Sequence, residues 1–247
     1  MTLNEFFSLV PKAAVAFSGG TDSAFLLWAA RECGCDVRAY YVKTPFQPQF
    51  ELEDARRLAS ELAVPMTVVE ADILAVPEAA ANGPQRCYHC KTALFSQLRQ
   101  AAREDGYMVL LDGTNASDDA GDRPGMRALR ELEVRSPLRE CGLTKADIRR
   151  LSREAGLFTW DKPAYACLAT RIPTGEAITG EILARVEGAE DALFRLGYTD
   201  FRVRVFHGAA RLQLPAGQLE RAVRERAVLR AALAPYFKPI LLDLEER

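Results

Sequence analysis

The sequence of 247 residues lacks both a net basic charge and a long apolar run. Its formal net charge of -2 gives no overall positive field, which disfavours a protein built mainly to bind nucleic acid. No apolar run approaches the roughly 20 residues of a membrane span. Residues 1–12 lack the basic start and the cleavage site of an export signal. We therefore expect a cytoplasmic protein with no membrane or nucleic-acid partner.

Internal repeats and low-complexity tracts are also absent. A hydrophobic content of 49% against 27% charged residues is ordinary for a globular chain, and the length suits one large domain or one domain plus a small one. The six cysteines should stay reduced in the cytoplasm. Clustered cysteines therefore favour metal binding or catalysis over disulfides.

A glycine-containing turn, SGGTDS at residues 18–23, is the most informative feature of the chain. The two glycines let main-chain N–H groups approach an anion, and the helix-like run that follows directs its positive end to the same point. Ser18 and Ser23 add hydroxyl donors, while Asp22 either holds a magnesium ion or caps the helix. Because the turn contains no lysine, a Walker-type loop is excluded. The order of strand, glycine pair, Asp-Ser and helix predicts a phosphate-binding turn.

Apolar runs alternate with stretches of helical periodicity through the N-terminal part of the chain. The runs span 13–17, 37–42, 66–70 and 107–112, and the helical stretches span 22–32, 50–62 and 91–104. This alternation predicts an α/β fold with a parallel sheet and helices on both faces. Ligands of such sheets gather at the carboxyl ends of the strands, where Ser18, Lys43 and residues 112–114 fall. Residues 116–139 indicate a long active-site loop, and 144–155 a helix capped by Thr144.

The pattern changes after residue 176. Helical stretches at 179–196 and 216–233 and strand-like runs at 201–206, 210–215 and 239–244 predict a small α+β domain. His207-Gly208 is a hairpin signal between its first two strands. We therefore expect two domains, 1–176 and 177–247.

Cys87 and Cys90 form a Cys-Tyr-His-Cys unit at the start of a predicted helix, where two thiolates can face one metal or cluster. Alone, such a pair is weak evidence, and the chain offers no second pair to complete a zinc site. His89, between them, would point elsewhere on a helix and is interpreted as a structural or surface histidine. Cys167, in an irregular stretch beside Arg171, is a candidate thiol of low pKa or a small apolar side chain that fills a loop.

The other three cysteines, Cys33, Cys35 and Cys141, lie beside glycines at turns and are interpreted as structural or incidental.

Longer motifs carry a specific resemblance. They are AFSGGTDS (16–23), RCYHCK (86–91), DGTNASD (112–118), DRPG (122–125), SPLRE (136–140), GLTK (142–145), TWDKPA (159–164), CLATRIP (167–173), GEAIT (175–179) and RVRVFHG (202–208). With these motifs the chain resembles the LarE family of ATP-dependent sulfur transferases, which helps to build the nickel-pincer nucleotide of lactate racemase. Thr21, Thr170 and the pair Leu212-Gln213 depart from the family pattern, and the last leaves the role of that position open.

The resemblance implies an adenine nucleotide alpha hydrolase-like PP-loop domain that binds ATP and magnesium. A carboxylate of a pyridinium biscarboxylic acid mononucleotide attacks the α-phosphate, pyrophosphate leaves, and a sulfur nucleophile converts the acyl-adenylate to a thiocarboxylate. The catalytic residues implied are Cys167, Asp22 and Ser23. The nucleotide or substrate contacts implied are Ala16, Phe17, Ser18, Gly19, Gly20, Ser23, Val42, Lys43, Gly113, Arg123 and Arg171.

The family also implies a homo-oligomer and a choice of sulfur source. In members with a single cysteine, the equivalent of Cys167 gives up its own sulfur. Another branch holds a four-iron four-sulfur cluster by three thiolates. Because this chain carries Cys87 and Cys90 as well, we favour a cluster held by Cys87, Cys90 and Cys167.

Two further groups of charged side chains are candidates. Arg202 and Arg204 alternate with valines, so they share one face of a strand and can jointly bind a substrate phosphate or carboxylate; a solvated strand face is the alternative. Glu190 and Glu220 are weaker candidates for a metal-binding acidic patch.

Three other functions remain open at this stage. A PP-loop tRNA thiolase would need an RNA-binding surface, and the sequence contains no RNA module. An amidating synthetase would need a glutaminase part, which 247 residues do not show. A non-catalytic ATP-binding or metal-carrying protein would bind ATP without releasing pyrophosphate.

Overall fold

A computed structural model describes residues 1–118 and 124–245, so the candidate Arg123 lies outside the described residues. Four parallel strands form the first sheet, in the order β3-β2-β1-β4. They are β1 (Lys12–Ala16), β2 (Asp36–Lys43), β3 (Met66–Glu70) and β4 (Leu110–Leu111). The predicted parallel sheet is confirmed. Its last strand is shorter than the expected 107–112, because it pairs with β1 only through Ala14 and Val15.

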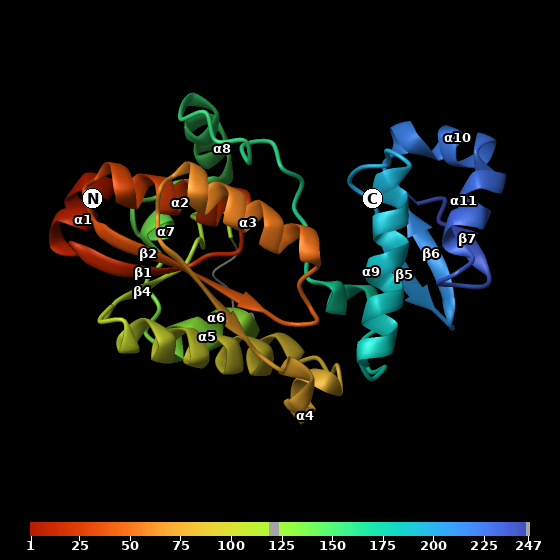
Figure 1. Cartoon of the computed structure of the whole chain (residues 1–247), viewed down its shortest axis with the longest axis horizontal. Helices are drawn as coiled ribbons and strands as arrows, with labels where there is room; N and C mark the ends of the chain where they lie inside the picture. Colours follow the sequence, from red (N-terminus) through yellow and green to blue (C-terminus); the bar gives the residue numbers. More distant parts are fainter. Residues whose placement is uncertain (119–123, 246–247) are drawn as a thin grey trace.

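Helices cover both faces of this sheet (Figure 1). The helices α1 (Leu3–Leu9), α2 (Thr21–Glu32) and α3 (Gln49–Glu61) lie on one face, and α5 (Arg86–Glu104) lies on the other. The sequence of β1 explains this arrangement, because successive side chains of a strand point to opposite faces. Ala13 and Val15 pack in the core with α2, whereas Ala14 packs with Leu98 of α5.

In the described part of the segment 116–139, expected to be one loop, two helices begin. They are α6 (Pro124–Glu131) and α7 (Pro137–Glu140), and each begins with a proline, which suits the first position of a helix. The loop prediction is therefore wrong for these residues. Burial of Ala128 and Leu129 stabilises α6 against α5, and the guanidinium of Arg127 lies 4.0 Å from the ring centre of Tyr88.

Helix α8 (Lys145–Glu154) begins as predicted at Thr144. The Thr144 hydroxyl accepts a hydrogen bond from the N–H of Asp147 at 3.2 Å, and the Asp147 carboxylate accepts one from the N–H of Thr144 at 3.1 Å. This reciprocal capping fixes the first turn of α8. The first turn carries Lys145, whose side chain reaches the glycine turn.

The C-terminal part forms a second sheet, β5-β6-β7 (Figure 1). Its strands are β5 (Arg202–Phe206), β6 (Ala209–Gln213) and β7 (Ile240–Leu242), and α9 (Gly180–Arg195) packs against β5. The predicted hairpin between β5 and β6 is confirmed: His207 and Gly208 both have positive φ, 48° and 79°, as a tight hairpin turn requires.

The single helix expected at 216–233 is divided into α10 (Ala216–Arg224) and α11 (Arg226–Leu233). Glu225 leaves helical geometry at the break, and its carboxylate accepts hydrogen bonds from Tyr198 and Arg221 at 3.0 Å each. The prediction of one continuous helix is therefore wrong at Glu225, where the helix is interrupted and the side chain bonds to Tyr198 and Arg221.

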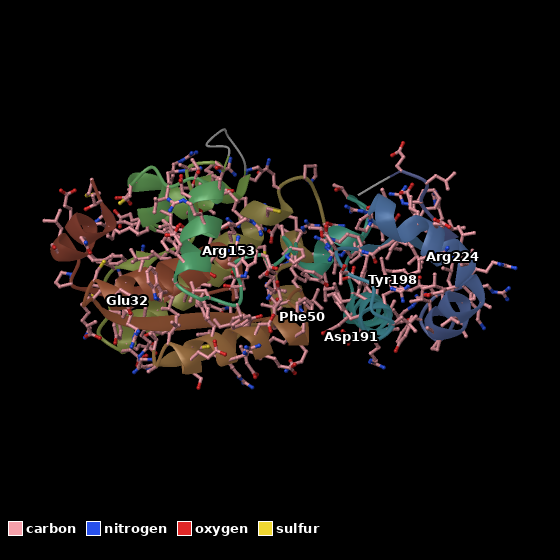
Figure 2. All side chains as sticks on the ribbon, turned by 90° about the horizontal axis from the view of Figure 1, so that it is seen from above. Glu32, Phe50, Arg153, Asp191, Tyr198 and Arg224 are labelled. Atoms are coloured by element: carbon pink, nitrogen blue, oxygen red, sulfur yellow. The ribbon has the colours of Figure 1, made fainter. Side chains whose placement is uncertain are left out.

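The two sheets lie side by side, joined by the chain between α8 and α9 (Figures 1 and 2). Phe50 of α3 lies near the junction, and its ring centre is 5.0 Å from that of Tyr165 and 5.4 Å from that of Phe194 in α9. One apolar core includes Leu168 and Ile172 together with residues of both parts. The segment that carries Cys167 is thus packed into the junction, and a domain boundary near residue 176 stays a prediction. None of the described helices combines the length and apolarity needed to cross a bilayer.

Candidate active site

The glycine turn follows β1 directly and leads into α2. Gly19 has a φ of 73°, and a Cβ added there would lie 3.1 Å from the Cβ of Ala55 and 3.2 Å from the carbonyl oxygen of Glu51. Both the conformation and the close approach of α3 therefore require glycine. No side chain caps the N-terminus of α2, so its first N–H groups stay available to an anion.

The end of β4 approaches the same helix N-terminus through Gly113. A Cβ at Gly113 would lie only 2.8 Å from the backbone nitrogen of Ser23. The neighbouring Asp112 accepts a hydrogen bond from the Ser136 hydroxyl at 2.6 Å. The two strand ends are thus held against one helix N-terminus, as a nucleotide site at the carboxyl edge of a parallel sheet requires.

A cavity of about 470 Å³ opens over the turn. Its lining is drawn from β1, α2, α3, α5, the end of β4, α8 and the segment 162–167. Among the predicted site residues it includes Ala16, Ser18, Gly20, Asp22, Ser23, Gly113 and Cys167. The structure therefore brings the predicted phosphate-binding turn and the predicted reactive cysteine to one cavity.

A smaller apolar hollow of about 150 Å³ adjoins this cavity, because both are lined by Ala16, Ser18, Gln47 and Phe95. Phe17, Val42, Tyr40, Tyr41, Leu94 and Leu98 complete its walls. The predicted residues Phe17 and Val42 thus line a space suited to a flat apolar group such as a nucleobase. The predicted Lys43 is placed differently: its ammonium donates to the carbonyl of Gln47 at 2.6 Å and faces a separate shallow hollow.

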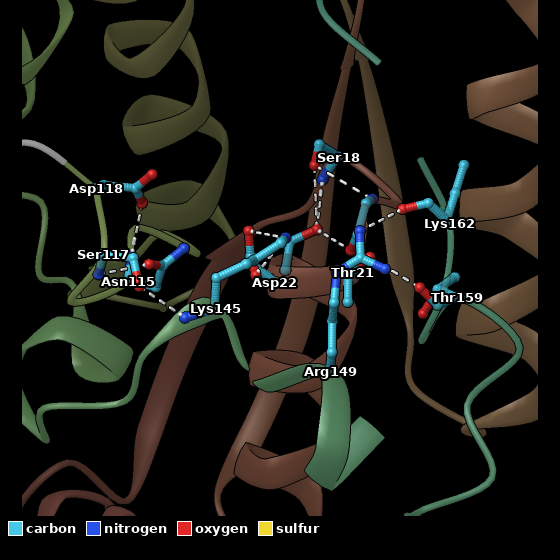
Figure 3. Close-up of polar contacts among 12 residues, drawn as sticks. Ser18, Thr21, Asp22, Asn115, Ser117, Asp118, Lys145, Arg149, Thr159 and Lys162 are labelled. Carbon is cyan, nitrogen blue, oxygen red and sulfur yellow. Dashed lines mark hydrogen bonds and ion pairs between the residues drawn. The ribbon is translucent and has the colours of Figure 1, made fainter. Parts of the chain in front are cut away.

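Asp22 does not cap its own helix. Its carboxylate forms an ion pair with Lys145, whose ammonium nitrogen lies 2.8 Å from each oxygen (Figure 3). Ser23 instead closes the turn, since its hydroxyl accepts from the N–H of Ser18 at 3.3 Å and lies 3.1 Å from the Ser18 hydroxyl. The capping alternative for Asp22 is therefore wrong in this structure.

A second lysine, Lys162, holds the other side of the turn (Figure 3). Its ammonium lies 2.7 Å from Asp54 of α3 and 3.4 Å from the carbonyl oxygen of Gly19. Sequence reasoning did not single out Lys145 or Lys162. The available signal was their place within two of the family motifs, GLTK and TWDKPA.

The three candidate cysteines come from two segments. Cys87 is exposed on the first turn of α5, whereas Cys90 and Cys167 pack in the same core. Burial, with the neighbouring thiols of Cys167 and Cys87, raises the pKa of Cys90 to about 12. Burial also raises the pKa of Cys167, so the expectation of a low-pKa thiol is wrong in this structure: the cost of desolvating a thiolate outweighs the nearby positive charge of Arg86.

Arg86 links the two cysteine segments. Its guanidinium donates to the carbonyl of Ala169 at 3.0 Å and lies 3.8 Å from the sulfur of Cys87. Among residues 1–118 and 124–245, no three cysteine, histidine, aspartate or glutamate side chains stand in the arrangement of a metal site. The thiol donors are close to one another, and the arrangement seen is that of free cysteines.

Arg171 and Glu190 form a buried ion pair, each with 1% of its surface exposed. Arg171 donates to both carboxylate oxygens of Glu190 at 2.8 and 3.2 Å, and Tyr165 and the N–H of Val203 donate to the same carboxylate. Two predictions are therefore wrong. Arg171 is not placed to contact a nucleotide, and Glu190 does not share an acidic patch with Glu220, whose side chain is 82% exposed and pairs with Arg224.

Arg202 and Arg204 do share one face of β5, but their donors already have partners. Arg202 is buried and donates to the carbonyls of Phe201 and Ala164, while Arg204 donates to the carbonyl of Thr170 at 2.7 Å. Burial and the nearby Arg171 guanidinium lower the pKa of Arg202 to about 10. Both arginines thus hold the segment that carries Cys167, and their contact with a substrate phosphate stays a prediction.

Comparison with known proteins agrees with this geometry. A family model described as queuosine biosynthesis protein QueC matches residues 12–83, which include the glycine turn. The chain is 39% identical to an uncharacterized protein of Synechocystis, over 90% of this chain and 84% of that protein. It is 33% identical to the pyridinium-3,5-bisthiocarboxylic acid mononucleotide synthase of Lactiplantibacillus plantarum, over 94% of this chain and 86% of that protein. The chain belongs to the LarE family.

Membership of the LarE family makes this chain an enzyme that uses ATP to transfer sulfur. A more distant relative supports the same chemistry: the chain is 26% identical to a tRNA-specific 2-thiouridylase of Clostridium botulinum, over 60% of this chain and 51% of that protein. The LarE match covers most of both chains, whereas the thiouridylase match leaves about half of that protein uncovered. The comparison therefore favours the LarE assignment over a tRNA thiolase.

Proposed function

We propose that this enzyme adenylates a carboxylate of a pyridinium dicarboxylate mononucleotide and converts it to a thiocarboxylate, a step in building a nickel-pincer cofactor. The observation that carries the proposal is the shared cavity, in which the phosphate-binding turn and Cys167 face the same space. The name of the Lactiplantibacillus relative supplies the substrate class.

ATP would lie with its base in the apolar hollow and its phosphates over the N-terminus of α2. Lys145 and Lys162 line the phosphate end and supply positive charge. The oxygens of Asp22 and Ser23 are ligands of the kind that magnesium prefers, so the residues present fit that ion. Bound there with ATP, magnesium would offset negative charge on the phosphates.

The reaction has two steps. A substrate carboxylate oxygen bonds to the α-phosphorus as the bond to the β-phosphate oxygen breaks, which releases pyrophosphate. A sulfur nucleophile then bonds to the activated carbonyl carbon, and the carbon–oxygen bond to AMP breaks. AMP is a far better leaving group than oxide, so adenylation makes the second step possible. The position of Cys167 in the cavity wall supports a sulfur source close to the activated carboxyl.

For the sulfur source we infer a four-iron four-sulfur cluster held by Cys87, Cys90 and Cys167. Three neighbouring thiols are the donors that such a cluster requires, and Cys167 among them lines the cavity. Cys87, which is exposed, would turn inward to join the other two. Bound there, the cluster would supply sulfide to the activated carboxyl. Loss of sulfur from Cys167 itself is the alternative for the same site.

Pyrophosphate release tests the function. Purified protein with ATP, magnesium and the pyridinium dicarboxylate mononucleotide should release pyrophosphate, and omission of the mononucleotide should stop the release. Asp22→Ala should nearly abolish it, because Asp22 lies at the phosphate end of the cavity. Release that does not depend on the mononucleotide, or that persists in the Asp22 variant, would contradict the proposal. ATP binding without any release would indicate a non-catalytic nucleotide-binding protein.

A further inference from the structure

Four carboxylates line the main cavity, and three of them have direct partners. Asp22 pairs with Lys145, Asp112 accepts from Ser136, and Asp118 accepts from the N–H of Asn115 at 2.9 Å. The fourth belongs to Glu51, on the first turn of α3. Its carboxylate makes no direct hydrogen bond or ion pair with any residue in the described ranges 1–118 and 124–245.

Glu51 lines the cavity near both the glycine turn and the segment 162–167 that ends at Cys167. Lys162 and Arg171 are the positive charges that act on its carboxylate most strongly, and its own charge acts on Tyr165. These residues flank Cys167, which lines the same cavity. Lys162 is already paired with Asp54, and Arg171 with Glu190, so neither neutralises Glu51 directly.

An unpaired carboxylate is unfavourable in a cavity that takes ATP and a dicarboxylate, because both ligands are anionic. One part of the proposed substrate differs in sign: the ring nitrogen of a pyridinium carries a positive charge. We propose that Glu51 recognises this cationic ring and so selects a pyridinium over an uncharged ring of the same shape. The inference rests on the proposed function and assigns Glu51 as its specificity-determining residue.

The electrostatics of Glu51 support this role. Burial raises the pKa of Glu51 to about 7, a rise increased by Asp54 and opposed by Lys162, Arg171 and Lys43. The negative charge of Glu51 in turn contributes to the raised pKa of Tyr41 and of Tyr165. A carboxyl with a raised pKa is ionised above that pKa and neutral below it. Binding of a cationic ring should therefore strengthen as the pH rises from about 6 to about 8.

Calorimetric titration of the full-length protein with the pyridinium dicarboxylate mononucleotide tests the inference. Glu51→Gln, which keeps shape and removes charge, should weaken binding about tenfold and flatten its pH dependence between about pH 6 and 8. Glu53→Gln is the matched control, because Glu53 is exposed on the same helix; it should bind as the unaltered protein does. The 1,4-dihydropyridine form of the mononucleotide has a neutral ring. It should bind the unaltered protein and the Glu51→Gln variant with equal affinity.

Unchanged affinity in Glu51→Gln would overturn the inference, and so would equal weakening for the charged and neutral rings. An equal loss of ATP affinity would also overturn it, by moving Glu51 to the nucleotide. Pyrophosphate release, measured separately, keeps the two proposals distinct. Charge-selective binding without pyrophosphate release would refute the proposed function and leave the role of Glu51 standing. Pyrophosphate release together with unaltered mononucleotide affinity in Glu51→Gln would support the function and refute the role of Glu51.

Discussion

The ammonium of Lys145 and the carboxylate of Asp22 join the first turn of α8 to the first turn of α2, with 2.8 Å from the nitrogen to each oxygen. The pair lies in the wall of the main cavity, beside the glycine turn. Each partner therefore controls the charge that the other presents to the phosphates of ATP. An aspartate beside a phosphate site is tolerable because this lysine balances it.

Lys145→Met should lower kcat for pyrophosphate release about a hundredfold, because it removes a positive charge from the site where negative charge develops and leaves Asp22 unpaired. Steady-state pyrophosphate assays at saturating ATP measure the effect. Lys12→Met, which removes a lysine of an exposed pair with Asp36, is the control and should leave kcat unchanged. A normal kcat in Lys145→Met would show that this lysine serves only to hold α8.

The sequence predicted the start of α8 at Thr144 but not the partner of Lys145. Capping is local, since Thr144 and Asp147 are three residues apart, and such patterns are visible in the sequence. The ion pair joins positions 123 residues apart, and only the docking of α8 on α2 decides it. The same reasoning explains why the order of strand, glycine turn and helix was predicted correctly, because it depends on adjacent residues.

The charged residues of α9 show a signal that was present but missed. Glu190 lies four residues after Val186 and three before Leu193, both buried, so it belongs to the apolar face of its helix. Its interpretation as part of a metal-binding acidic patch ignored that spacing. The partner, Arg171, comes from an irregular segment without periodicity, so its pairing with Glu190 could not be predicted. Helix α6 was missed because glycine, proline and charge in its neighbourhood indicated a loop.

Glu190→Ala should lower the free energy of unfolding by about 3–5 kcal/mol, because it leaves the buried Arg171 without a counter-charge and removes the acceptor of Tyr165. Urea unfolding followed by circular dichroism measures the change. Glu220→Ala removes the carboxylate of an exposed pair with Arg224 and should leave the unfolding midpoint unaltered. Equal midpoints for the two variants would contradict the structural role given to Glu190.

Arg204→Ala should raise the apparent KM for the mononucleotide and leave ATP binding intact, because Arg204 holds the carbonyl of Thr170 near Cys167 and lies away from the glycine turn. Arg202→Ala should act in the same direction. Arg224→Ala, at an exposed position of α10, serves as the control. Weakened ATP binding in the Arg204 variant would instead assign this arginine to the nucleotide site.

The sulfur source gives the last prediction. If Cys87, Cys90 and Cys167 hold a cluster, protein purified without oxygen should be brown and contain about four irons per chain. Each single change of these cysteines to serine should remove that iron, and added sulfide should support repeated turnover of the unaltered enzyme. Cys35→Ser, at a buried position in the core of the first sheet, should keep the iron.

The competing outcome has a different signature, because a sacrificed cysteine cannot be reused. Sulfur taken from Cys167 breaks its bond between Cβ and Sγ with loss of the α-proton, and leaves dehydroalanine. The protein would then be colourless, stop after one turnover, and lose the mass of hydrogen sulfide at Cys167 alone. Colourless, iron-free protein that still transfers sulfur in the Cys87→Ser and Cys90→Ser variants would refute the cluster, since neither of those thiols would then be needed.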